Sequence, residues 1–183
     1  MRIIAGAARG KTLLAPEGLD TRPTSDRTRE SLFNILAPRI MGARVLDLFS
    51  GSGAICAEAL SRGAAYCVAV DADPAACRVI RRNLELKNIE GRSEVLQCDF
   101  RKALGAVRGP FDIVYADPPY KELGFYTEAA KLLAERKLLA NDGILILECE
   151  STVEPVLPEG FCITDVRRYG RAKLCFVRQE VSQ

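Results

Sequence analysis

The stretch VLDLFSGSG, residues 45–53, decides the fold class, because a short apolar run is followed at once by a glycine-rich turn. The apolar run is typical of a buried strand, and residues 54–61 continue the chain as an apolar helix. Glycines at such a junction let the backbone approach a ligand closely, and the start of the helix offers free N–H donors. The stretch therefore predicts a ligand-binding strand–turn–helix unit.

The same alternation continues along the chain. Further strands are expected at 66–70, 93–97, 111–116 and 144–148, with helices at 75–88, 101–106 and 125–135 between them. Strands that alternate with helices favour an α/β fold with a doubly wound, Rossmann-like and mostly parallel sheet. Two last strands, 163–168 and 174–178, flank the turn 169–171 and predict an antiparallel hairpin at the C-terminal edge.

A small extension precedes this alternation. Residues 2–5 and 11–14 are strand candidates around Gly6 and Gly10, and a link with Pro16, Gly18 and Pro23 follows them. Thr24, Ser25 and Asp26 offer N-caps for a helix that runs to about Leu36. We expect residues 1–40 to form a basic hairpin-and-helix extension and residues 41–183 to form the main domain.

The composition excludes several classes of protein. The 183 residues contain no histidine, which removes histidine-based triads, general bases and metal ligands together. Seven cysteines without a Cys-x-x-Cys pair favour a reduced, cytoplasmic compartment and no metal site. No run approaches the length of a membrane span, and the N-terminus lacks the apolar core of a signal peptide.

The net charge is only +2, but the charges are unevenly distributed. Residues 1–44 hold eight basic and four acidic side chains, and residues 166–178 hold five basic side chains and no acid. Arg9, Lys11, Arg22 and Arg27 of the first cluster are candidate contacts to nucleic acid. The alternative is an ordinary solvated face, which is as common for a single charge cluster of this size.

Acids follow four successive predicted strands. They are Asp47, Asp71, Asp99 and Asp117, and because parallel strands end at one edge, the four should line one crevice. A dinucleotide fingerprint would need a third glycine at Cys56, so nicotinamide binding is not favoured. Asp71 stands 20 residues after Gly51, where an acid commonly binds ribose hydroxyls. Asp71 and Asp99 could instead cap the helices that follow them.

The corner Asp117-Pro118-Pro119-Tyr120 ends the strand at 111–116. The prolines stop the strand and stiffen the turn. A planar base could stack on Tyr120 while its exocyclic amine donates to Asp117 and to the Pro118 carbonyl. The alternative is a simple proline-stopped turn.

These motifs resemble those of class I S-adenosylmethionine-dependent methyltransferases of the branch that methylates planar nitrogen. The N-terminal segments are similar to those of the RsmD family of 16S rRNA guanine-N2 methyltransferases. The segments that carry this resemblance are RIIAG (2–6), RGK (9–11), RPTSDR (22–27), RE (29–30), FNIL (33–36), LDLFSGSG (46–53) and EALSRGA (58–64).

The resemblance implies S-adenosylmethionine as cofactor, S-adenosylhomocysteine as product, no metal, and a monomer that acts on 16S rRNA, either free or within a 30S particle. It assigns cofactor contacts to Asp47, Phe49, Gly51, Ser52, Gly53, Asp71, Asp99 and Phe100. It assigns the target amine to Asp117, Pro118, Pro119 and Tyr120, and RNA contacts to the N-terminal basic residues.

Other functions remain open at this stage. A DNA adenine-N6 methyltransferase uses the same corner, although the chain has no separate target-recognition domain. A protein glutamine-N5 methyltransferase usually carries Asn at the position of Asp117. A non-catalytic RNA-binding or assembly module could keep the cofactor fold without turnover.

Overall fold

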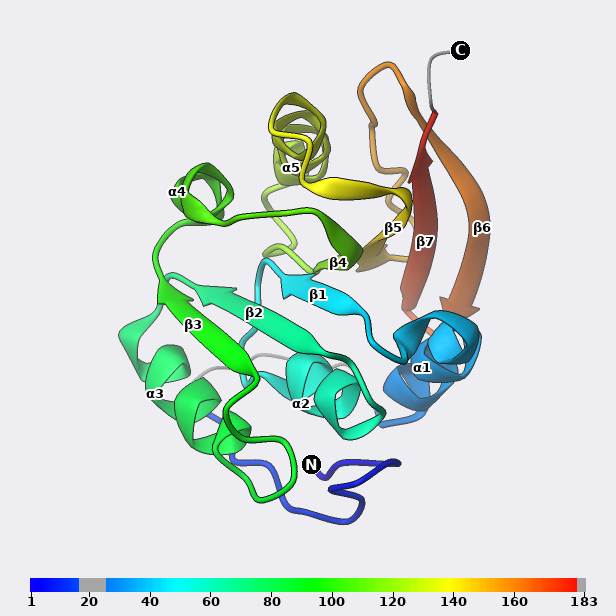
Figure 1. Cartoon of the computed structure of the whole chain (residues 1–183). Helices are drawn as coiled ribbons and strands as arrows, with labels where there is room; N and C mark the ends of the chain where they lie inside the picture. Colours follow the sequence, from blue (N-terminus) through cyan, green and yellow to red (C-terminus); the bar gives the residue numbers. More distant parts are fainter. Residues whose placement is uncertain (17–25, 181–183) are drawn as a thin grey trace.

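Seven strands form one sheet in the order β3-β2-β1-β4-β5-β7-β6 (Figure 1). The computed structural model describes residues 1–16 and 26–180. The strands are β1 (Arg44–Asp47), β2 (Tyr66–Asp71), β3 (Ser93–Gln97), β4 (Phe111–Ala116), β5 (Leu139–Glu150), β6 (Phe161–Tyr169) and β7 (Ala172–Gln179). The first five are parallel to one another, whereas β7 is antiparallel to both β5 and β6. The predicted doubly wound sheet with an antiparallel C-terminal edge is confirmed.

Helices cover both faces of this sheet. They are α1 (Asp26–Ile40), α2 (Ala54–Ser61), α3 (Pro74–Leu84), α4 (Phe100–Ala106) and α5 (Gly124–Glu135). Figure 1 shows α1, α2 and α3 on one face and α4 and α5 on the other. Each face has its own apolar core, as expected when side chains alternate between the two sides of every strand.

Helix α2 is buried along its whole length, which is unusual for a helix on the outside of a sheet. The N-terminal extension explains this burial, because Ile3, Ala8 and Leu13 belong to the same apolar core as α2. Gly6 makes the close approach possible. Its φ is 85°, and a Cβ on Gly6 would lie 1.9 Å from the Ser61 carbonyl oxygen.

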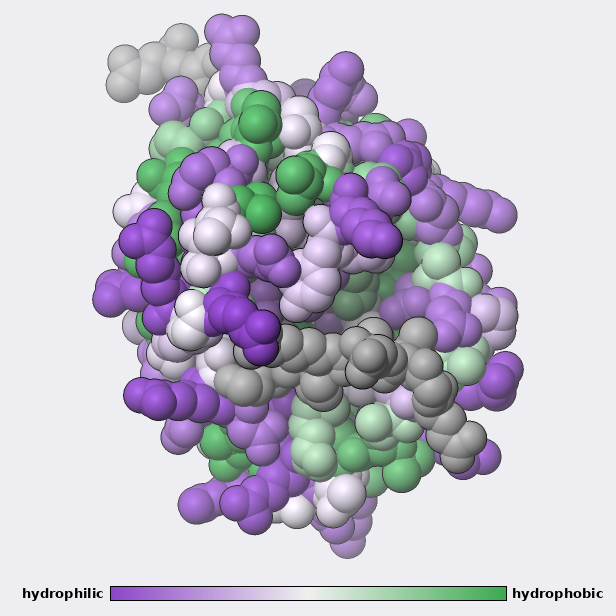
Figure 2. All heavy atoms as spheres, turned by 180° about the vertical axis from the view of Figure 1, so that it is seen from behind, coloured by the Kyte–Doolittle hydropathy of each residue, from purple (hydrophilic) through white to green (hydrophobic). Residues whose placement is uncertain are grey.

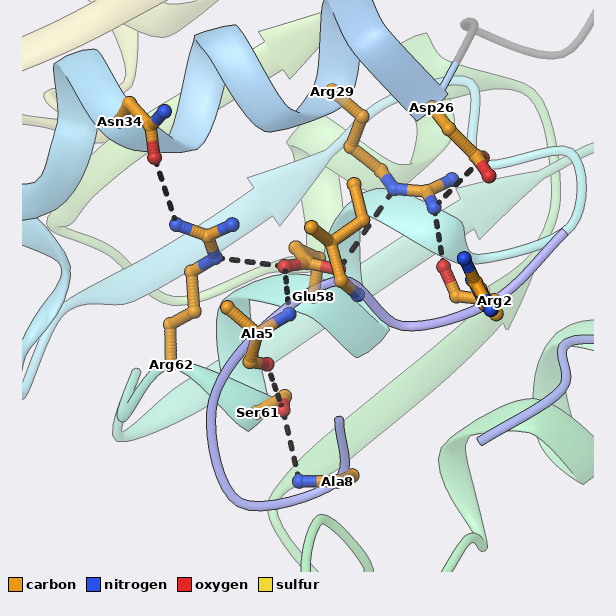
Figure 3. Close-up of polar contacts among 10 residues, drawn as sticks. Arg2, Ala5, Ala8, Asp26, Arg29, Asn34, Glu58, Ser61 and Arg62 are labelled. Atoms are coloured by element: carbon orange, nitrogen blue, oxygen red, sulfur yellow. Dashed lines mark hydrogen bonds and ion pairs between the residues drawn. The ribbon is translucent and has the colours of Figure 1, made fainter. Parts of the chain in front are cut away.

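Polar contacts fasten the extension to α2 as well (Figure 3). The Glu58 carboxylate accepts hydrogen bonds from the backbone N–H groups of Ile4 at 2.8 Å and Ala5 at 3.1 Å. It also pairs with Arg62 Nε at 2.7 Å and with the fully buried Arg29 Nε at 3.9 Å. The extension is thus a packed part of the protein. The division at residue 40 stays a prediction.

Several predicted boundaries were wrong. The extension contains one isolated bridge, Arg2 to Thr12, instead of two strands. Helix α1 continues past Leu36 to the buried Ile40, and Pro38 is accommodated in its last turn. Helix α3 ends at Leu84, and Asn88, the predicted end, has a left-handed φ of 84° that a helix does not allow. The predicted caps Thr24 and Ser25, and the link residues Gly18 and Pro23, lie outside the described residues.

One face of the molecule is mainly hydrophilic. Figure 2 shows hydrophilic side chains over most of this face, with hydrophobic areas toward its top and its lower edge. Among the helices of the described ranges, none is long and apolar enough to cross a membrane.

Candidate active site

The carboxyl edge of the parallel strands collects the predicted acids. Asp47 ends β1, Asp71 ends β2, and Asp117 directly follows β4. Asp99 follows β3 after one intervening residue and begins α4. Since β3, β2, β1 and β4 are neighbours in the sheet, the structure brings all four acids to one edge.

Asp47 is the most deeply buried of these acids, with 1% of its surface exposed. One carboxylate oxygen accepts a long hydrogen bond from the Phe49 N–H at 3.4 Å. The other oxygen, Oδ2, is buried and has no hydrogen-bond partner among the described residues. Burial raises the pKa of Asp47 to about 7. Such an oxygen is costly to bury alone, so Asp47 is suited to a donor from outside the described residues, such as a ligand.

The glycine-rich turn is fastened to β2. The Ser50 hydroxyl donates to the Asp47 carbonyl at 3.1 Å and accepts from the Val70 N–H at 3.1 Å. Gly51 has a φ of 54°, and a Cβ at this position would meet nothing within 4 Å. The backbone at Gly51 is therefore open on one side, as close approach of a ligand requires.

Gly53 has a different role. Its φ is 76°, and a Cβ there would lie 3.1 Å from the Ile80 side chain. This glycine allows α3 to pack closely against the start of α2. Ser52, the residue between the two glycines, accepts a hydrogen bond from Asn83 Nδ2 at its carbonyl, at 2.8 Å.

Asp71 binds the glycine-rich turn, and its carboxylate can still accept hydrogen bonds from a ligand. Its Oδ2 accepts from the Gly51 N–H at 2.8 Å, and its Oδ1 accepts from the Asp73 N–H at 2.9 Å. Burial is the largest influence on its carboxyl group and raises its pKa. The helix cap of α3 is Asp73, which accepts from the Ala75 N–H at 2.8 Å. The capping alternative for Asp71 is therefore wrong.

Asp99 is the N-cap of α4. It accepts from the Arg101 N–H at 2.9 Å and pairs with the Arg101 guanidinium at 3.1 Å. The ring of Phe100 is 2% exposed and packs against Phe49 and Phe125, with ring centroids 5.2 and 5.0 Å away. A cofactor role for Asp99 and Phe100 stays a prediction.

Arg101 joins this aromatic cluster, which the sequence did not reveal in full. Its guanidinium lies 4.6 Å from the ring centroids of both Phe100 and Phe125. Two hydrogen bonds to the Glu128 carboxylate, at 2.6 and 2.7 Å, hold it there. The pattern of residues gave no direct signal for this cluster, because its members come from α4, α5 and the glycine-rich turn.

The corner after β4 stops the strand as predicted, because β4 ends at Ala116. Pro118 is buried, Pro119 is exposed, and Tyr120 is 54% exposed. Burial, then the charge of Glu148 and then that of Asp47, raise the pKa of Asp117 well above its usual range. The corner thus combines an accessible ring with a carboxyl group that is easily protonated.

Glu148 is the site residue that the sequence reasoning missed. It lies in β5, is 8% exposed, and accepts a short hydrogen bond from the Tyr115 hydroxyl. The Tyr126 hydroxyl donates to the Glu148 backbone carbonyl at 2.9 Å. The expected strand at 144–148 ended on this acid, so the rule that identified the other four acids could have identified Glu148 too.

Three of the predicted RNA contacts lie at the surface of the described residues. Arg9, Lys11 and Arg27 are exposed. A hollow of about 400 Å³ between the extension and the start of α1 is lined by Arg9 and Arg27, together with Arg2, Asp26 and Glu30. Arg22 lies outside the described residues. No group of His, Cys, Asp or Glu side chains within 1–16 and 26–180 is arranged to hold a metal ion.

This chain is similar to known proteins over nearly its whole length. The family model described as Conserved hypothetical protein 95 matches residues 1–178. The ribosomal RNA small subunit methyltransferase D of Escherichia coli (strain K12) is 39% identical over 158 residues, covering 86% of this chain and 78% of the relative. A Bacillus subtilis protein proposed to be an rRNA methyltransferase is 39% identical over 162 residues, covering 87% and 86%.

Solved structures agree with this relationship. An Escherichia coli protein proposed to be a methyltransferase superposes with a TM-score of 0.87 at 33% identity, covering 100% of this chain and 99% of that chain. A protein from Streptococcus pyogenes superposes with a TM-score of 0.75 at 32% identity, covering 83% and 95%. The similarity therefore includes the N-terminal extension as well as the sheet.

Proposed function

We propose that this chain, which belongs to the RsmD family, transfers a methyl group from S-adenosylmethionine to the exocyclic N2 of a guanine in 16S rRNA. One observation carries the proposal. The corner of Asp117 and Tyr120 stands at the carboxyl edge beside buried acids, in a chain 39% identical to a ribosomal RNA small subunit methyltransferase D. The names of the relatives support methylation of rRNA in general, and guanine N2 is the specific target that we propose.

The ends of β1 and β2 suit this cofactor. Asp71 has a carboxylate that can accept from ribose hydroxyls, and the open side of Gly51 admits a ligand close to the backbone. Asp47 Oδ2 lacks a donor among the described residues, which suits a group with N–H or ordered water at this point. When bound, S-adenosylmethionine supplies an activated methyl group on a sulfonium sulfur. The protein then has to supply mainly alignment and electrostatics.

The corner after β4 would hold the target amine. Asp117 and the Pro118 carbonyl accept hydrogen bonds from the amine, which favours its nucleophilic form, and Tyr120 stacks on the base. The base must leave its own stack to reach this ring. The methyl–sulfur bond breaks as the methyl–nitrogen bond forms, the sulfur keeps the bonding pair, and the amine then loses one proton to solvent through Asp117.

The basic extension would hold the RNA. Arg9 and Arg27 line one hollow, Lys11 is exposed close to Arg9 in the chain, and contacts of such side chains to RNA go mainly to phosphates. Recognition by shape suits a small enzyme that acts on folded rRNA or on a 30S particle in the cytoplasm.

Nucleoside analysis tests the proposal. The purified protein is incubated with isotope-labelled S-adenosylmethionine and with naked 16S rRNA, 30S particles or DNA, and the digested nucleosides are identified by mass. We expect N2-methylguanosine in naked 16S rRNA, in 30S particles or in both. N6-methyladenine in DNA as the main product would overturn the assignment of substrate. Cofactor binding without turnover on any of these would favour a non-catalytic RNA-binding module.

A further inference from the structure

Glu148 lies beside Asp117 in the sheet. Strands β4 and β5 are parallel, and their register pairs Ala116 with Leu147, so the next residues, Asp117 and Glu148, are neighbours at the carboxyl edge. Alternation along β5 also sets the direction of the Glu148 side chain. Ile146 packs in the core under α1–α3, and Glu148 shares its side of the sheet. Two carboxyl groups therefore meet at the point where the amine is expected.

Tyr115 gives the two acids different surroundings. Its hydroxyl donates directly to the Glu148 carboxylate, and a hydrogen bond to a charged carboxylate stabilises the charged form. Asp117 forms no ion pair in the described part of the chain. Two like charges this close cannot both form easily in a buried place. Of the pair, Glu148 is therefore the acid that keeps its charge.

The other described groups that act on Asp117 add no positive charge. Asp47 of β1 is a further acid, and burial, Glu148 and Asp47 all raise the pKa of Asp117. Tyr126 of α5 is an uncharged phenol near Asp117, because burial and neighbouring acids raise its pKa well above the usual range. Asp71 of β2 is the next acid along the edge and acts on Asp47. The described groups around Asp117 are thus other acids and an uncharged phenol.

We propose that Glu148 is a positioning residue that acts through Asp117: Tyr115 keeps Glu148 charged, and Asp117 consequently holds the single proton that the pair shares. This inference rests on the proposed function, in which Asp117 must be ionised to accept fully from the target amine. Methyl transfer then rises with pH as the pair loses its proton. Cationic groups of a bound ligand also favour loss of this proton. Asp117 is therefore a better hydrogen-bond acceptor with such a ligand bound than in the ligand-free protein.

Glu148→Gln tests the inference, because it removes one charge while keeping the shape of the side chain. The pH dependence of single-turnover methyl transfer is compared with the titration of the Asp117 carboxyl carbon by NMR in the ligand-free protein. We expect both the acid limb and the titration to move to lower pH. Tyr115→Phe should move both in the same direction but less far, because Glu148 then competes for the proton.

Tyr126→Phe is the matched control. It removes a hydroxyl that also bonds Glu148, but at the backbone carbonyl, 2.9 Å away, and not at the carboxylate. This variant should leave both curves in place. An unchanged Asp117 titration in Glu148→Gln, or an equal shift in Tyr126→Phe, would overturn the role of Glu148. A shifted titration in a protein that methylates no guanine would keep the acid pair and overturn the proposed function.

Discussion

Two buried acids on the same side of the sheet have opposite surroundings. Glu58 in α2 is fully buried, and its carboxylate accepts two backbone N–H groups and pairs with Arg62 and Arg29. Asp47 at the end of β1 is 1% exposed, yet one of its oxygens has no partner in the described residues. The described residues satisfy the acid that holds the extension in place but leave one oxygen of the acid at the carboxyl edge without a donor.

This difference separates structural from functional charge. Burying an unpaired polar group is unfavourable, so an acid that stays unsatisfied reduces stability unless a ligand completes its surroundings. Folded proteins accept such costs mainly at functional sites. We therefore expect substitutions at the two positions to have opposite effects on folding and on activity.

Glu58→Gln should give the largest loss of stability. The change leaves the buried Arg29 guanidinium without its buried negative partner, and breaking a buried ion pair in this way costs about 3–5 kcal/mol. Denaturant unfolding at pH 7 measures the effect. Asp26→Asn is the control, because Asp26 also pairs with Arg29 but is largely exposed, and surface pairs contribute about 1 kcal/mol or less. Equal losses in the two variants would show that burial of Glu58 is unimportant.

Asp47→Asn should stabilise the protein at alkaline pH. The folded protein keeps the Asp47 proton up to about pH 7, whereas the unfolded chain releases it near 3.8. The free energy of unfolding therefore falls as pH rises between these values, and this loss is complete above about pH 7. The Asn side chain cannot ionise, so the variant avoids this loss. Its free energy of unfolding at pH 8 should exceed that of the wild type by up to about 4 kcal/mol, with little difference at pH 4.

Denaturant unfolding of both proteins at pH 4, 6 and 8 checks this expectation. The two stability curves should converge in acid and separate in base. Parallel curves across the whole range would mean that Asp47 titrates normally and is not held in an unfavourable charged state.

Asp71→Ala should weaken binding of S-adenosylmethionine by about 1.5–3 kcal/mol, the range for a lost hydrogen bond to a charged acceptor. Titration calorimetry measures this change. Asp73→Ala is the matched control two residues away, because it removes the cap of α3 and should affect stability more than affinity. Unchanged affinity in Asp71→Ala would remove Asp71 from the cofactor site.

The double variant Arg9→Ala and Lys11→Ala should have the smallest effect, on RNA alone. Its RNA affinity should fall, and the slope of affinity against salt concentration should decrease by about one unit per lost phosphate contact. Arg39→Ala with Arg178→Ala removes the same charge near the start of β5, where both side chains donate to the Asp142 carbonyl. If the two double variants have the same slope, the extension only supports α2.

The sequence predicted the sheet well because its signals are local. The strands predicted at 66–70 and 111–116 end within one residue of β2 and β4, and the glycine-rich turn predicts the edge where ligands bind. The extension was harder to predict, because a single bridge and the contacts of Glu58 replace regular strands. Contacts between distant segments leave no periodic pattern.

The same reason explains the gaps in the predicted site. The strand-end rule could have identified Glu148, but its contact with Tyr115 of the neighbouring strand, 33 residues away in the chain, is visible only in the structure. The Asp99 carboxylate could not be identified as a cap paired with Arg101 from its position alone, since a cap and a ligand-binding acid occur at the same place after a strand.

Asp117→Ala tests most directly whether the acids of the carboxyl edge serve catalysis instead of folding. Turnover on 16S rRNA, affinity for S-adenosylmethionine and the free energy of unfolding are measured on the same preparation. We predict that turnover falls by about 10²–10³-fold, the usual cost of losing one positioned electrostatic group, while affinity and stability stay near the wild-type values. Turnover close to that of the wild type would contradict the account.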